Sequence, residues 1–129
     1  MKKHYIRILN PIYPFKIHVF LNCTSVSEIK SKVKSRKKEY TKSLHEKIDE
    51  LDFKNVHGRA FEHLGHIIIF VKKFNGKPEC YDSLHHEITH AVDLSAEYIG
   101  IEQPTYVREY SAYMHGFITN EIYKKILKT

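Results

Sequence analysis

Residues 82–100 read DSLHHEITHAVDLSAEYIG, and this stretch predicts the helix that carries the candidate chemistry. Asp82 or Ser83 can cap its start, because a side-chain oxygen there accepts a hydrogen bond from a backbone N–H. Gly100 is the signal at its other end, since glycine readily adopts the left-handed conformation that closes many helices. We therefore expect a helix that starts near Asp82 and ends at Gly100.

Inside this helix, His86 and His90 are four residues apart and carry the predicted chemistry. Four residues turn a helix by about 400°, so the two imidazole rings lie nearly above one another on one face. Two imidazole nitrogens in that arrangement can bind one zinc ion at about 2.0–2.1 Å. Glu87 is poorly aligned to join them as a ligand but well placed to take a proton from a zinc-bound water. The pattern predicts Zn²⁺ as the cofactor and Glu87 as the general base.

A catalytic zinc needs a third protein ligand, and the last predicted helix offers Glu109. Glu109 follows His90 by 19 residues, with a turn between them that lets the last helix fold back antiparallel on the first. Ala112 and Gly116 share the Glu109 side of that helix, and small residues there let two helices approach closely. We therefore predict His86, His90 and Glu109 as the zinc ligands.

The chain before these helices predicts a small sheet and a helical segment. Residues 4–9 form a short β-like run, and residues 15–22 alternate apolar and polar side chains, the period of a half-buried strand. Ser25 and Glu28 form a capping box that opens the helical segment. This segment reaches about residue 51, as one helix or as two with a break near residues 36–38.

Two more strands are predicted before the helix that carries the histidines. They cover residues 56–62 and 66–74, and Leu64-Gly65 is the turn between them. The resulting order of strands and helices is ββαββαα, with the last helix beginning after Pro104. We expect a single α+β domain over residues 1–129, with a mostly antiparallel sheet packed on the last two helices.

At this point the two final helices resemble the active-site region of the gluzincins, the thermolysin-like zinc peptidases. The resemblance is carried by His86-Glu87-Ile88-Thr89-His90-Ala91-Val92, followed by Glu109-x-x-Ala112. The small size of the chain and the Glu-x-x-Ala-Tyr start of the last helix also resemble short metallopeptidases encoded by phages. The resemblance implies a minimal zincin-like fold, with His86, His90 and Glu109 as zinc ligands and Glu87 as the base.

The chain departs from the gluzincin pattern in two respects, a supporting residue and the oxyanion donor. Tyr113 stands where gluzincins have an aspartate that supports a histidine, and Asp93 is available as a substitute partner. The donor that stabilises the oxyanion is open among Tyr106, Tyr110, Tyr113 and His115. Tyr113 is favoured because it shares the Glu109 face, although a core tyrosine fits the same position.

Charge and composition place limits on the partners. The net charge is +6, and basic residues cluster between Lys30 and Lys47, which predicts a solvated helix face or a surface for a weak anionic partner. The longest apolar run, Ile67 to Val71, is five residues, too short to span a membrane. Two cysteines do not make a disulfide framework, so we expect free thiols in a cytoplasmic protein.

The function predicted from these features is hydrolysis of a peptide bond in a peptide or protein substrate. The strand at residues 67–71 is expected to present an edge to which an extended peptide adds by main-chain pairing. One alternative is an inactive zincin-like module that binds a protein or nucleic acid through the basic helix. Another is a regulatory protease that cuts one repressor. Such proteins usually carry a DNA-binding domain, for which 129 residues leave little room.

Overall fold

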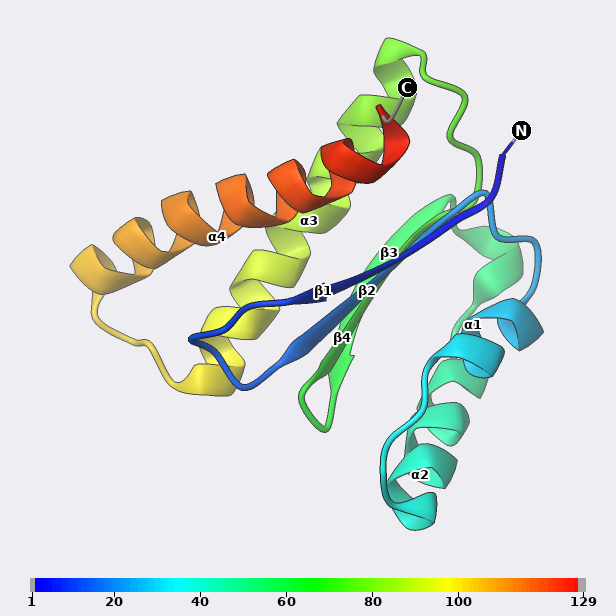
Figure 1. Ribbon diagram of the computed structural model, residues 1–129, viewed down its shortest axis with the longest axis horizontal. Coiled ribbons are helices and arrows are strands. Elements are labelled where there is room, and N and C mark those ends of the chain that lie inside the picture. Colours follow the sequence, from blue (N-terminus) through cyan, green and yellow to red (C-terminus); the bar gives the residue numbers. More distant parts are fainter. Residues whose placement is uncertain (1, 128–129) are drawn as a thin grey trace.

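The computed structural model describes residues 2–127 and has the predicted order of strands and helices (Figure 1). The strands are β1 (His4–Leu9), β2 (Lys16–Leu21), β3 (Gly58–His63) and β4 (His66–Val71). The helices are α1 (Val26–Lys32), α2 (Lys38–Asp49), α3 (Pro78–Ile99) and α4 (Pro104–Ile126), with one 3₁₀ turn, η1, at Phe53–Asn55. The expected α+β class is therefore confirmed, and the segment between residues 25 and 51 forms two helices.

The four strands form one sheet in the order β1-β2-β4-β3. The pairs β1–β2 and β3–β4 are antiparallel, as expected for hairpins, but β2 and β4 run parallel to one another. Parallel neighbours need a crossover connection, which here consists of α1, α2 and β3. The sheet is therefore mixed, with β1 and β3 at its edges.

Strand β4 lies inside the sheet, so the expected edge at Ile67–Val71 is wrong. All six residues of β4 are buried, and both of its sides are hydrogen-bonded, to β2 and to β3. An uninterrupted apolar run is typical of a strand that is covered on both faces. The edge near the histidine helix belongs instead to β3.

Alternation along the strands divides the interior into two cores. In β4, Ile67 and Ile69 face a core shared with α3 and α4, whereas Ile68 and Phe70 face a core shared with α1 and α2. The sheet thus lies between two helical layers, and Figure 1 shows α1 and α2 on the side opposite α3 and α4. No helix among residues 2–127 is long and apolar enough to cross a membrane.

The ends of the helices correct two details. α3 begins at Pro78, four residues before Asp82, because proline has a fixed φ and lacks the N–H that the first helical turn leaves unbonded. α4 begins at Pro104 for the same reason. The C-terminal signal is confirmed, since Gly100 ends α3 in the left-handed conformation with a φ of 79°. Ser25 caps α1 as predicted, accepting a hydrogen bond from the Glu28 N–H.

Candidate metal centre

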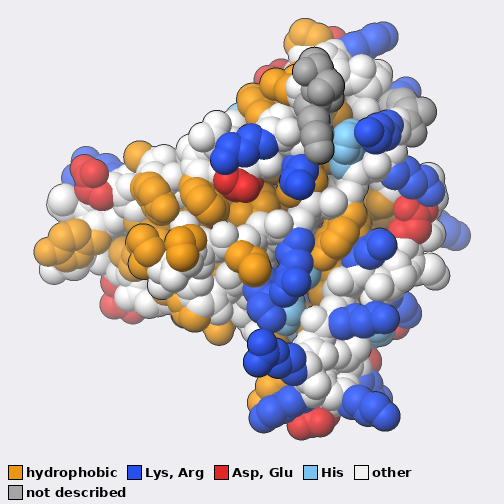
Figure 2. All heavy atoms as spheres, in the orientation of Figure 1, with side chains coloured by type: hydrophobic (Ala, Val, Ile, Leu, Met, Phe, Trp, Pro, Cys, Tyr) orange, Lys and Arg blue, Asp and Glu red, His pale blue; other side chains and the backbone are white. Residues whose placement is uncertain are grey.

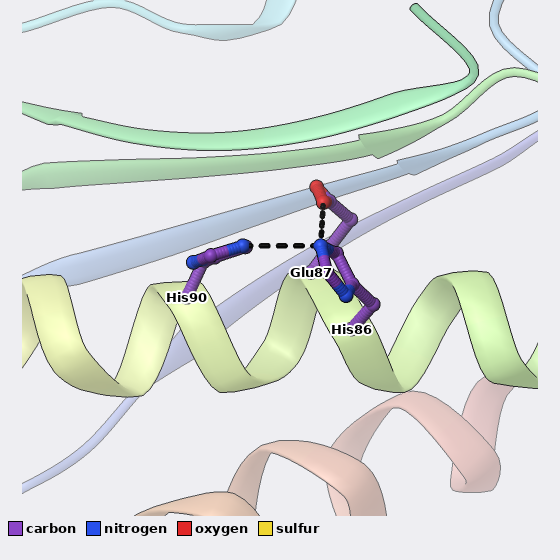
Figure 3. A group of neighbouring side chains, drawn as sticks. All are labelled: His86, Glu87 and His90. Atoms are coloured by element: carbon purple, nitrogen blue, oxygen red, sulfur yellow. Dashed lines mark hydrogen bonds and ion pairs between the residues drawn. The ribbon is translucent and has the colours of Figure 1, made fainter.

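The two predicted imidazole ligands lie together on one face of α3 (Figure 3). The Nε2 atoms of His86 and His90 are 3.1 Å apart, and both side chains are exposed. The helix produces this proximity by itself, because residues four apart are stacked one turn from each other. Two nitrogens at this separation can each contact one ion at the usual zinc–nitrogen distance of about 2.0–2.1 Å.

Glu87 points from the same helix toward the sheet, and its packing depends on a glycine. Only 6% of the residue is exposed. A Cβ atom at Gly58, in β3, would lie 3.4 Å from Glu87 Cγ and 2.8 Å from the carbonyl oxygen of Phe70. Glycine within a strand often marks a close approach of this kind. Gly58 therefore leaves the space that the Glu87 side chain needs above β3.

One oxygen of the Glu87 carboxyl has no hydrogen-bond partner among the described residues, although it is buried. The other, Oε1, lies 4.0 Å from His86 Nε2. Burial raises the pKa of Glu87, and the nearby His86, His90 and Arg59 partly oppose that effect. A buried polar atom without a partner is costly, so it indicates a group that the protein alone does not supply. A cation or a water molecule would satisfy this oxygen.

The donor atoms of His86, Glu87 and His90 fit a metal ion. One nitrogen or oxygen from each residue lies within 4.8 Å of the others, and no other such group of three occurs among residues 2–127. Imidazole nitrogen and carboxylate oxygen are ordinary zinc ligands. The arrangement can therefore hold a divalent cation next to a carboxylate of raised pKa.

Glu109 is not brought to this group. It is exposed on α4 and is absent from the cluster of candidate ligands. The structural reason is the direction in which α4 packs: Tyr110, Met114 and Ile118 face the core. Gly116 lies on the solvent side, where an added Cβ would meet nothing within 4 Å. The expectation that the small residues of α4 face α3, one of the grounds for placing Glu109 at the zinc, is therefore wrong.

Tyr113 is also engaged elsewhere. Its hydroxyl accepts a hydrogen bond of 3.1 Å from Asn10 Nδ2, in the turn between β1 and β2, and 47% of the residue is exposed. Tyr110 is buried and shares a 2.6 Å hydrogen bond with Ser95 Oγ, and His115 stacks on His85. These contacts engage the three candidate oxyanion donors away from the metal cluster, so the structure assigns none of them to it.

The remaining residues proposed from sequence fall into place without a metal role. Asp93 is exposed beside His90 and makes no hydrogen bond to either imidazole among the described residues. Tyr106 is 65% exposed near the start of α4. Cys23 and Cys80 are free, as expected, and neither joins the cluster.

Two cavities meet at Glu87, and they include residues that the sequence analysis did not single out. The first, about 470 Å³, lies toward the start of α3 and is lined by His57, Asp82, Ser83 and His86 among others. The second, about 450 Å³, lies on the His90 side and includes Arg59, Asp93 and Glu97. The sequence contains one signal for these cavity residues, a glycine within a strand pattern: Gly58 stands between His57 and Arg59.

The β3 edge beside these cavities is open. Lys72 N donates to His57 O, so hydrogen-bonded pairs alternate from there and the N–H and C=O groups of Gly58 and Ala60 point away from β4. No hydrogen bond between described residues uses these outward groups.

No protein-family model matches the chain, and no match was found among curated proteins or among solved structures.

Proposed function

We propose that this protein is a zinc-dependent peptidase of gluzincin-like, minimal zincin type. The observation that carries the proposal is the buried carboxylate oxygen of Glu87 beside the imidazole pair, which has no hydrogen-bond partner in residues 2–127. A buried carboxyl of raised pKa is suited to general-base chemistry, because its proton affinity is closer to that of the reacting groups near neutral pH. The resemblance of His86-Glu87-x-x-His90 to the gluzincin helix supports the same assignment, although Glu109, the third ligand that the resemblance implies, lies outside the cluster.

The residues have distinct roles in this proposal. His86 and His90 would hold the zinc ion, which when bound supplies a Lewis acid for the scissile carbonyl and lowers the pKa of water. Glu87 takes one proton from the attacking water as its oxygen forms a bond to the carbonyl carbon. Glu87 then passes this proton to the leaving nitrogen as the C–N bond breaks. The products are an amine and a carboxylic acid, which releases its remaining proton to solvent at neutral pH, and the Glu87 carboxylate is regenerated.

The open edge of β3 supports an extended peptide as the substrate. The outward N–H and C=O groups of Gly58 and Ala60 can pair with a peptide backbone, and this pairing would carry the scissile bond past Glu87. Substrate side chains would enter the two cavities. The cavity on the His90 side contains Asp93 and Glu97 against one cation, Arg59, which favours a basic side chain there.

An inactive zincin-like module that binds a partner is the second candidate. It is favoured by one observation: Glu109 is exposed and lies outside the metal cluster. Two imidazoles and a carboxylate can still hold a cation without supporting turnover. The two candidates differ in whether purified, zinc-loaded protein cleaves peptides.

The decisive experiment compares wild type with Glu87→Gln on a pool of synthetic peptides, read by mass spectrometry. We expect cleavage by the wild type and a loss of about 10²-fold or more in the variant, with zinc still bound. Glu79→Gln, in the first turn of the same helix and outside both cavities, is the matched control and should retain activity. Undiminished cleavage by Glu87→Gln would contradict the mechanism, and a zinc-loaded wild type that cleaves nothing would favour the inactive module.

A further inference from the structure

The net positive charge of this protein comes from one part of the chain. Residues 30–47 contain eight lysines and arginines and two glutamates, a net charge of +6. The whole chain also carries +6, so the other 111 residues contain equal numbers of basic and acidic side chains. Figure 2 shows lysine and arginine side chains spread over the region of α1 and α2. We call the exposed surface of residues 30–47 the basic face.

Most cations of the basic face have no acidic partner in the part of the chain that the structure describes. Lys30 pairs with Asp49 at 2.8 Å and Lys47 with Glu50 at 3.5 Å. Six others have no carboxylate within 4.0 Å among the described residues: Lys32, Lys34, Arg36, Lys37, Lys38 and Lys42. Holding so many like charges together is unfavourable by self-repulsion, and an anionic ligand would relieve that repulsion.

These cations surround a groove. A depression of about 750 Å³ runs from the connection between α1 and α2 along the length of α2, and Lys34, Arg36, Lys38 and Lys42 line it. Ser35 and Thr41 line it as well, and they fix the connection between the helices: Thr41 Oγ1 accepts a 2.9 Å hydrogen bond from Ser35 N. Glu46 and Asp49 also border the groove, and Asp49 is already paired with Lys30.

The N-terminus of α2 adds to the positive electrostatic potential of the basic face. Lys37 is the N-cap residue of α2 and forms no side-chain capping bond with the described residues. Because Tyr40 N donates to Lys37 O, the N–H groups of Lys38 and Glu39 are the ones that keep their capacity to bind an anion, next to the Glu39 carboxylate. Arginine and lysine around such a terminus form the usual setting for phosphate recognition. The groove, the unpaired cations and the helix terminus therefore favour the same class of ligand, a chain of phosphates.

A nucleic acid fits this surface better than a membrane does. A helix that binds bilayers inserts apolar side chains, but Leu44 and Ile48 of α2 are fully buried against the sheet. The single large exposed apolar residue of the basic face is Tyr40, 44% exposed, with Lys37 Nζ 5.1 Å from its ring centre. A tyrosine beside a cation can stack on a base.

We propose that the basic face binds the phosphate backbone of nucleic acid. The face lies on the side of the sheet opposite α3, so a bound strand leaves the two cavities at Glu87 accessible. The proposal does not depend on hydrolysis. Bound nucleic acid would place the α3 site near proteins that occupy the same strand.

The test is fluorescence anisotropy with labelled RNA of about 20 nucleotides and a DNA duplex of similar length, over a range of salt. We expect binding at about 50 mM salt, with log K falling against log [salt] at a slope of about −3 to −5 if four to six cations contact phosphates. The triple variant Lys34→Glu, Lys38→Glu, Lys42→Glu should weaken binding by about 30-fold or more. The relative affinities of RNA and duplex then show which form the face prefers.

A matched control separates the basic face from net charge alone. Lys54→Glu, Lys73→Glu and Lys77→Glu change the total charge equally but lie outside residues 30–47, and this triple variant should lose much less affinity. Equal losses in both triples, or no binding to either nucleic acid at low salt, would overturn the proposal. Binding to vesicles rich in phosphatidylserine but to neither nucleic acid would also overturn it. Circular dichroism of each variant verifies that the fold is retained.

Discussion

Gly58 lies directly against Glu87: a Cβ atom on this glycine would be 3.4 Å from Glu87 Cγ. The same atom would also lie 2.8 Å from the carbonyl oxygen of Phe70, closer than van der Waals contact permits. The edge strand and the histidine helix are thus fitted to each other at the one residue whose carboxyl carries the proposed chemistry.

Replacing Gly58 by alanine should therefore harm both stability and activity. We expect Gly58→Ala to lower the free energy of unfolding by about 1–3 kcal/mol, because β3 must shift away from β4 or from α3. Displacement of Glu87 should also reduce peptide cleavage by about tenfold or more. Urea denaturation and initial rates measure the two effects.

Gly116→Ala is the control for this change. Gly116 lies inside α4, and an added Cβ would meet nothing within 4 Å. Alanine is favoured over glycine in a helix by about 1 kcal/mol, so this variant should be slightly more stable and equally active. A Gly58→Ala protein as stable and as active as wild type would contradict the packing argument.

The metal ligands can be separated by zinc titration. His90→Ala should weaken zinc binding by at least about tenfold, because it removes one of the two imidazoles. Glu109→Ala should leave the affinity nearly unchanged, since Glu109 is exposed and outside the cluster. Isothermal titration calorimetry with zinc measures both. A loss in Glu109→Ala as large as that in His90→Ala would show that α4 repositions to bring Glu109 to the metal.

Cleavage specificity should depend on the cavity on the His90 side. If Asp93 and Glu97 receive a basic side chain, peptides with lysine or arginine near the cleaved bond should be preferred. The double variant Asp93→Asn, Glu97→Gln should lower kcat/KM for these peptides by about tenfold and leave kcat/KM for neutral peptides unchanged. Equal effects on basic and neutral peptides would argue against a role in specificity.

The burial of His18 leads us to expect a lower free energy of unfolding in acid. Its side chain is 2% exposed, accepts or donates hydrogen bonds to Tyr5 and His66, and has Arg7 and Lys16 nearby. Burial, together with His66 and these two cations, lowers the pKa of His18 to about 3. The unfolded chain, with a pKa of about 6.5, then binds a proton that the folded chain excludes, so stability is full above pH 6.5 and falls toward pH 3.

The size of this effect can be stated for one interval. Between pH 8 and pH 5, His18 alone should reduce the free energy of unfolding by about 2 kcal/mol. His18→Gln cannot titrate and should show a correspondingly smaller fall, measured by urea denaturation at both pH values. An identical fall in the variant would assign the acid sensitivity to other groups, such as His66 and His115, whose pKa values burial also lowers.

The helices and strands of this fold depend mainly on interactions between residues close in sequence, so the sequence by itself determined most of them. Apolar alternation over residues 15–22, the capping box at Ser25 and the closing glycine at Gly100 each act through neighbours within a few residues. The His86–His90 pair is equally local, because one helical turn is enough to bring the imidazoles together. The predicted class, the order of elements and this pair therefore agree with the structure.

Tertiary packing decided which strand lies at the edge of the sheet and which face of each helix is buried. Residues 66–74 are predicted as a strand from sequence, but only the pairing of β4 with both β2 and β3 made it interior and left β3 as the edge. Likewise, the rotation of α4 followed from burying Tyr110, Met114 and Ile118, and that rotation turned Glu109 and Gly116 to solvent. Helical spacing fixes which residues share a face, whereas the free energy of burying the most apolar face decides where it points.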